Sequence, residues 1–226
     1  MVSDMLKQLW DNGIIQLGIW ETVYMTLLST LIAYGIGLPI GVILCITDKD
    51  GIRPNRLINR ALGFIVNIFR SIPFIILMVA MLPVAKAIVG TSMGNKAMIV
   101  MLIIAAAPYV ARMVESSIKE VGHGVIEAAQ AMGTPNFKII TRVLIPEAKP
   151  SLIIGAVIST VTILGYSAMA ATIGGTGLGQ IAIIYGHQRS NYDIVWLCVI
   201  LTVVIVQIIQ EVGTLIAHKT DKRIVK

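Results

Sequence analysis

The sequence predicts an all-α membrane protein with five transmembrane helices, its N-terminus outside and its C-terminus in the cytoplasm. Three observations support this fold class. Of the 226 residues, 56% are hydrophobic and 13% are charged, about half the charge of an ordinary soluble domain, so lipid must be the solvent for most of the surface. Several uncharged segments are long enough to cross a bilayer, and the basic residues gather on one side of them.

The first predicted span covers residues 22–46. The 26 residues between Glu21 and Asp48 carry no formal charge, and at about 1.5 Å rise per residue they can cross the hydrocarbon core with some tilt. Gly37 and Gly41 stand four residues apart within this span. Small residues at this spacing let another helix approach closely. The two glycines either serve such a contact or are incidental.

The second span is predicted at 71–89 and follows an amphipathic segment. Residues 57–69 have the pattern of a helix that lies in the membrane interface, with a basic residue near each end. Arg70 and Pro73 are therefore expected to be structural residues at this interface. An arginine placed there avoids the cost of about 2.5–3.5 kcal/mol at mid-bilayer.

The third, fourth and fifth spans are predicted at 95–114, 151–173 and 194–217. Residues 151–188 hold 38 positions without Lys, Arg, Asp or Glu, too many for one span and too few for two spans with a loop. The glycine run at 174–179 lowers helix propensity. We therefore expect a turn there, followed by a short apolar segment outside the membrane.

The basic residues fix the predicted orientation. Fourteen of the 18 Lys and Arg residues lie within 48–70, 112–149 and 218–226. The positive-inside rule places these segments in the cytoplasm, and a sixth span would move the basic tail outside. We attribute the net charge of +6 to this excess of basic residues on the cytoplasmic side. Because aromatic residues make up only 6% and do not interleave with basic runs, we expect no nucleic-acid partner.

The longest cytoplasmic connection carries a motif. It consists of Glu127, Ala128 and Ala129, then Gly133 after three residues, then residues 143–146 after nine more. We expect a short helix over 121–133 that exposes Glu127 beside a small-residue surface. Gly133 would end this helix, because glycine is favoured just past a helix C-terminus and Pro135 opposes continuation. The helix either sits in a groove of a partner or merely caps a surface loop.

This motif resembles the EAA signature of bacterial ABC-importer permeases: Glu-Ala-Ala, three residues, Gly, nine residues, then Ile-x-Leu-Pro. The departures are Val143 for Ile and Ile145 for Leu, both conservative. The resemblance implies a coupling helix that docks on cytoplasmic ABC ATPase subunits. Glu127 would pair with a basic group of the ATPase, and Gly133 would provide the turn.

The chain lacks the GxxxxGK[ST] phosphate-binding loop of ATPases. It is therefore expected to be a transport subunit and not an enzyme on its own, with no catalytic residues, no metal and no cofactor. The resemblance implies that ATP and Mg²⁺ are bound by the partner ATPase.

Further blocks narrow the resemblance. Residues 67–74 resemble the Phe-Arg-x-x-Pro segment of amino-acid importer permeases, and residues 88–92, 107–115, 165–169 and 177–181 resemble methionine-importer permeases. In the latter family the methionine of the Gly-Tyr-Ser-Ala-Met block lies at the gate of the translocation pathway. Met169 matches it by position, with Tyr166 and Ser167 beside it. The alternative for these three residues is ordinary lining of a helix–helix interface.

The resemblance implies that residues 1–226 form a single permease domain in the cell inner membrane. It would be the pore-forming subunit of an ATP-driven methionine importer, working with ATPase subunits, an external substrate-binding protein and a second copy of itself. A permease for another amino acid is the nearest alternative. An ion-coupled secondary transporter would need buried ionisable groups and usually inverted repeats. A membrane enzyme would need paired carboxylates, a nucleophile constellation or a metal cluster. None of these patterns is evident in the sequence.

Overall fold

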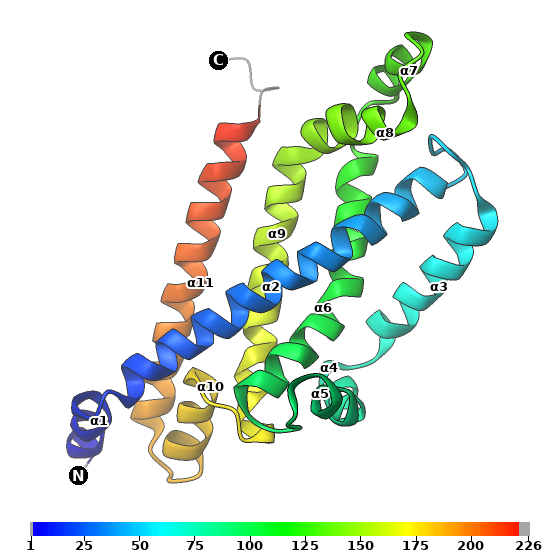
Figure 1. The fold of residues 1–226 in the computed structure, drawn as a ribbon. Helices are drawn as coiled ribbons and strands as arrows, with labels where there is room; N and C mark the ends of the chain where they lie inside the picture. The colour runs from blue at the N-terminus through cyan, green and yellow to red at the C-terminus, as the bar shows by residue number, and fades with distance from the viewer. Residues whose placement is uncertain (1, 222–226) are drawn as a thin grey trace. The chain divides into compact units, whose positions relative to one another are not determined.

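The computed structural model describes residues 2–221, and every regular element within that range is a helix (Figure 1). The α-helices are α1 (Val2–Asp11), α2 (Ile14–Thr47), α3 (Arg56–Ser71), α4 (Phe74–Ala80), α5 (Leu82–Val89), α6 (Gly94–Lys119), α7 (His123–Ala131), α8 (Asn136–Ile139), α9 (Ile145–Ser167), α10 (Leu178–Gln180) and α11 (Tyr192–Thr220). Two π-helical segments, η1 (Ile140–Leu144) and η3 (Ile181–His187), and one 3₁₀ segment, η2 (Ala168–Ile173), complete the chain.

Four helical stretches are long and apolar enough to cross a membrane: α2, α6, the continuous run Asn136–Ile173 and α11. Helices α3 and α4 pass the same test only as a pair, bent by 103° at the break between them. The described chain therefore has four candidate spans, or five if the bent pair is one broken span. The prediction of an all-α membrane protein is confirmed at this level.

The second predicted span differs most from its prediction. The sequence predicts one helix over 71–89, whereas the structure forms α4 and α5, which meet at Met81. Ile72 is extended, with φ −83° and ψ 125°, because a residue before proline is disfavoured in the helical region and Pro73 has no N–H to donate. Pro83 then stands at the first turn of α5. Two prolines thus divide the apolar run.

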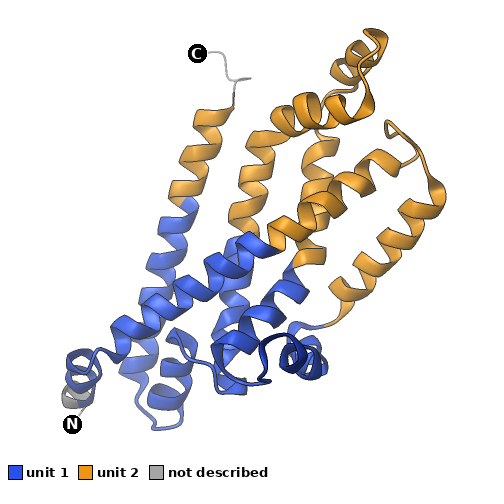
Figure 2. Ribbon diagram, viewed as in Figure 1, with its two compact units in different colours: residues 1–32, 73–106, 160–210 blue, residues 33–72, 107–159, 211–226 orange. Residues whose placement is uncertain are grey.

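The chain forms two compact units, which Figure 2 shows in different colours. Unit 1 contains residues 1–32, 73–106 and 160–210; unit 2 contains residues 33–72, 107–159 and 211–226. Helices α2, α6, α9 and α11 each contribute residues to both units.

The core of unit 1 joins the start of α2 to the segment after the glycine turn. Its buried members are Leu9, Ile15, Leu178, Ile181, Ile194 and Cys198. The predicted turn is present: Gly174 has φ +69° and Gly177 has φ +118°, values that favour glycine. Thr22 Oγ1 accepts a hydrogen bond of 2.9 Å from the Leu178 N–H. The side chain of Asn95 binds both the hydroxyl and the N–H of Thr176.

In unit 2 the glycines of the first span pack against α6. A Cβ atom at Gly37 would lie 2.7 Å from a Val110 methyl carbon, and one at Gly41 would lie 2.5 Å from the Ala111 carbonyl oxygen. Gly35, in the same helix, has no such neighbour within 4 Å. The packing role of Gly37 and Gly41 is therefore confirmed, because any side chain there would push the helices apart.

Helix α3 runs antiparallel to the end of α2 within unit 2. The Asn55 N–H donates to the Thr47 carbonyl at 2.9 Å, and one turn later Asn59 Nδ2 donates to the Leu44 carbonyl at 2.8 Å. Val66 is buried with Leu44 and with α6. The sequence predicts an interfacial helix over 57–69. In the structure, Gly63 and Val66 of this segment pack against α2 and α6, which are both candidate membrane spans.

Candidate functional site

The short helix of the motif is α7. Three residues separate it from the end of α6, and it lies within the expected range 121–133. Gly133 has φ +71°, and its N–H donates to the Gln130 carbonyl at 2.9 Å. The next N–H, from Thr134, returns to the Ala129 carbonyl at 3.1 Å. Gly133 therefore ends α7 in a left-handed conformation that side-chain-bearing residues rarely adopt.

The Glu-Ala-Ala residues face two directions. Ala129 is buried at 4% exposure, so its small side chain seats α7 on the rest of unit 2. Glu127 and Ala128 are exposed. This division matches a helix that is fixed on one face and offers the other face to a partner.

Two large apolar side chains extend the exposed face beyond the motif. Met132 is 77% exposed at the end of α7, and Phe137 is 75% exposed on α8. Sequence reasoning did not single them out; their signal was the presence of large apolar residues in an otherwise polar connection. We call Glu127, Ala128, Met132 and Phe137 the docking surface.

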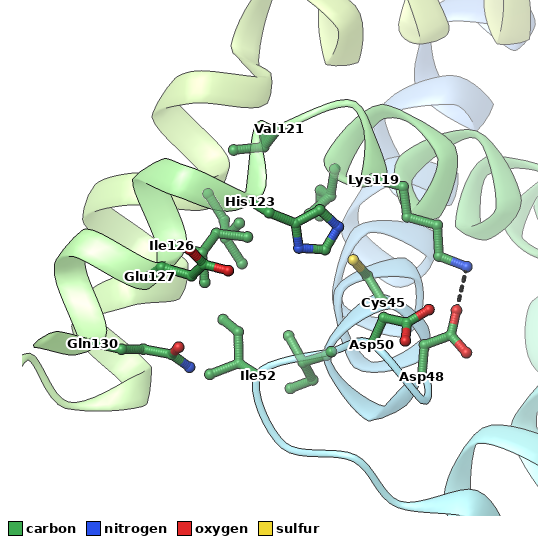
Figure 3. A pocket seen from close by; sticks show the side chains of 14 residues that line it. Cys45, Asp48, Asp50, Ile52, Lys119, Val121, His123, Ile126, Glu127 and Gln130 are labelled. Atoms are coloured by element: carbon green, nitrogen blue, oxygen red, sulfur yellow. Dashed lines mark ion pairs between the residues drawn. The ribbon is translucent and has the colours of Figure 1, made fainter.

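A pocket of about 470 Å³ lies beside α7 in unit 2. Figure 3 shows His123 and Glu127 of α7 on one side, and Asp48 and Asp50 of the turn after α2 on the other. Aliphatic side chains form much of its remaining wall, among them Ile52. Within the described residues, no three His, Cys, Asp or Glu side chains are grouped so as to hold a metal ion.

An ion-pair chain begins at the edge of this pocket. Lys119 Nζ lies 2.6 Å from an oxygen of Asp48 and 2.8 Å from an oxygen of Glu115. The hydrogen bond from Lys119, together with one from the Lys49 N–H, holds the pKa of Asp48 below its ordinary value. These ion pairs therefore connect the turn after α2 to the last turn of α6.

The same series of ion pairs and hydrogen bonds continues to α3 through Arg112. One guanidinium nitrogen donates to Glu115 at 2.6 Å, and the other donates to Asn67 at 2.9 Å and to the Gly63 carbonyl at 3.3 Å. The Glu115 side chain is only 9% exposed. This buried carboxylate thus bridges two cations, and it links three helices of unit 2. Sequence reasoning assigned it no role.

The predicted gate residues lie in unit 1 and have different surroundings. Met169 belongs to η2 and is 36% exposed. Tyr166 stacks on Phe74 with ring centroids 4.5 Å apart. Ser167 is buried and donates to the Leu164 carbonyl at 2.7 Å. Tyr166 therefore packs against α4, Ser167 is buried and bonded within its own helix, and Met169 is partly exposed.

The remaining predicted residues lie at the proline break. Pro73 directly precedes α4, and Arg70 lies exposed in the last turn of α3. Within the described residues, the Arg70 side chain has no hydrogen-bond or ion-pair partner.

Comparison with known proteins gives consistent matches over most of the chain. The family described as "Binding-protein-dependent transport system inner membrane component" matches residues 37–223. The methionine import system permease protein MetP of Bacillus subtilis (strain 168) is 42% identical over 218 residues, which are 96% of each chain. The D-methionine transport system permease protein MetI of Escherichia coli (strain K12) is 50% identical over 152 residues, covering 67% of this chain and 70% of the relative.

A solved structure is also similar. It is described as inward-facing conformations of the MetNI methionine ABC transporter, in the CY5 SeMet soak crystal form. One of its chains superposes with a TM-score of 0.91 and 44% sequence identity, over 92% of this chain and 97% of that chain.

Proposed function

The chain belongs to the family of binding-protein-dependent transport system inner membrane components, and on that premise we propose that it is the pore-forming permease subunit of an ATP-driven methionine importer. The observation that carries this proposal is the likeness to methionine permeases along nearly the whole chain, in sequence and in fold. The working complex would contain two copies of this chain, separate ATPase subunits and an external substrate-binding protein, in the cell inner membrane.

We propose five membrane crossings, with the bent pair α3 and α4 as the second and α5 continuing it. This count places the N-terminus outside and the C-terminus in the cytoplasm. The basic residues after α2, after α6 and in the C-terminal tail support this orientation. The connection that carries α7 then lies in the cytoplasm.

The docking surface is proposed to contact the ATPase subunit. Glu127 offers a carboxylate to a basic side chain, while Met132 and Phe137 offer apolar area of the kind that anchors protein interfaces. The turn at Gly133 fixes the angle between α7 and α8. ATP and Mg²⁺ belong to the partner, so this chain performs no covalent chemistry of its own.

Met169 is proposed as the gate residue of the pathway. Its thioether is flexible and polarizable, so it can close an opening without placing a charge there. Tyr166 and Ser167 support it by fixing the helix end from which η2 continues: one stacks on Phe74 and the other binds Leu164. Alternating access would then open and close this point as the ATPases close and separate.

The proposed function is tested by reconstituting the chain with its cognate ATPase and measuring ATP-dependent uptake of labelled methionine against competing amino acids. We expect uptake that requires ATP and that unlabelled methionine suppresses. Glu127→Lys, or deletion of residues 126–133, should abolish co-purification with the ATPase. Uptake by proteoliposomes that contain this chain alone would contradict the proposal and favour an ion-coupled transporter.

A further inference from the structure

Helix α3 places its last arginine, Arg70, far along a candidate membrane span. It starts beside the end of α2, where Asn55 binds the Thr47 carbonyl, and it runs antiparallel to α2 from there. Arg70 follows Arg56 by 14 positions, which corresponds to roughly 20 Å along the helix. The hydrocarbon core is about 30 Å thick, so Arg70 lies within it if α3 begins at the cytoplasmic boundary of the membrane.

The exposed surface of α3 has two chemically different faces. Residues three or four positions apart share one side of a helix, which aligns Arg56, Arg60, Asn67 and Arg70 on a polar face. Another side carries Phe64, Ile65 and Ile68, which are 66%, 52% and 44% exposed. The apolar side suits lipid. The polar face needs water or a partner, because a guanidinium stays charged at any physiological pH and is costly in hydrocarbon.

The positive charge on the polar face is largely uncompensated. Arg112 borders this face, but its charge is matched by Glu115. Arg60 and Arg70 are both exposed, and neither has a hydrogen-bond or ion-pair partner among residues 2–221. A groove of about 650 Å³ opens along the first part of α3, where the polar face meets the apolar Leu57 and Phe64; Arg60, Asn67 and Arg112 are its charged and amide lining. Arg60 borders this groove and Arg70 lies further along α3, and a guanidinium group without a partner is suited to a carboxylate.

We propose that the polar face of α3 lines the water-filled translocation pathway and that Arg70 and Arg60 attract the carboxylate of the amino-acid substrate. This inference rests on the proposed function, because it takes the chain to be an amino-acid permease. It gives Arg70 a role in the pathway in place of the structural role at the interface that the sequence suggested. It also leaves the apolar side of α3 to lipid or to packing between subunits.

The accessibility of the face is tested in the assembled complex with its ATPase. Cysteine is introduced singly at Arg70, Arg60 or Asn67, or at the matched apolar positions Ile65 and Ile68, after Cys45 and Cys198 are replaced by alanine. A membrane-impermeant anionic methanethiosulfonate should modify the three polar-face positions at least about tenfold faster than the two apolar ones. Equal rates on both faces, or faster reaction at Ile65 and Ile68, would overturn the proposal. Three polar-face positions keep the test decisive if one variant does not assemble.

The carboxylate preference is tested by protection. Excess methionine should slow modification of Asn67→Cys severalfold, whereas methioninamide, which lacks the carboxylate, should not. Adding Arg70→Gln should remove this protection, and adding Arg70→Lys should keep most of it. Equal protection by the amide, or protection that survives Arg70→Gln, would refute the role of the guanidinium. A wild-type complex that takes up no methionine would count against the proposed function alone, because the contrast between the two faces is measured without transport.

Discussion

The buried carboxylate of Glu115 is predicted to be a major contributor to the stability of this chain. Its side chain is 9% exposed and accepts charge-assisted hydrogen bonds of 2.6 Å from Arg112 and 2.8 Å from Lys119. Glu115→Gln keeps the size but removes the charge. Breaking a fully buried ion pair costs about 3–5 kcal/mol. Lys119 is 45% exposed and retains Asp48, so a smaller loss of about 2–3 kcal/mol is expected.

The assay is thermal unfolding of the purified protein in detergent, followed by tryptophan fluorescence at a fixed scan rate. For a chain of this size each kcal/mol shifts the melting temperature by about 2–4 °C, so Glu115→Gln should lower it by roughly 5–10 °C. Lys49→Ala is the matched control, because Lys49 and Asp50 form a 3.7 Å pair with side chains 85% and 70% exposed. It should shift melting by no more than about 2 °C. A Glu115→Gln variant that melts with the wild type would refute the reasoning.

Three further predictions concern other contacts of unit 2. The hydrogen bond from Lys119 lowers the pKa of Asp48, so ionised Asp48 stabilises the fold above the ordinary carboxyl pKa and loses this effect as the pH falls through its own lower pKa. Between about pH 5 and pH 3, the melting temperature should therefore fall less steeply for Asp48→Asn than for the wild type. Gly41→Ile should prevent folding or strongly reduce membrane yield, since its Cβ would lie 2.5 Å from the Ala111 carbonyl oxygen. Gly35→Ala has open space around it and should raise the free energy of unfolding by up to about 1 kcal/mol. Equal yields of the two variants would contradict the packing argument. Met132→Ser should weaken binding to the cognate ATPase by about tenfold in a pull-down titration without changing the melting temperature, because the lost side chain is exposed in the free chain; unchanged affinity would remove Met132 from the docking surface.

Several features could be predicted because they depend on local sequence. Uncharged length determines the long helices, and the spacing of Gly37 and Gly41 anticipates the contact with α6. The left-handed end of α7 at Gly133 follows from the poor fit of other residues to that conformation. The division of 71–89 was also open to prediction, because Pro73 and Pro83 stand at its two breaks.

Other features depend on tertiary contacts that no local pattern specifies. An amphipathic period in α3 predicts a polar and an apolar side, but it does not say whether the polar side meets lipid headgroups or a water-filled pathway. Arg112, Glu115 and Lys119 have the spacing of ion pairs within one helix. Their links to α3 and to Asp48 come from the packing of unit 2, so the chain of contacts emerges only in three dimensions.

Motion of α7 can reach α3 through α6, because several contacts within unit 2 join these helices. Only three residues separate α6 from α7, so the connection between these two helices is short. Gly41 brings α2 so close to α6 that sliding would produce a backbone clash with Ala111. Arg112 holds α3 through Asn67, and Lys119 holds the turn between α2 and α3 through Asp48. A displacement of α7 should therefore move the three helices together and carry the polar face of α3 with them. Under this reasoning, Glu115→Gln would loosen α3 from α6 and raise the ATP consumed per methionine transported, an effect that a loss of stability alone would not produce.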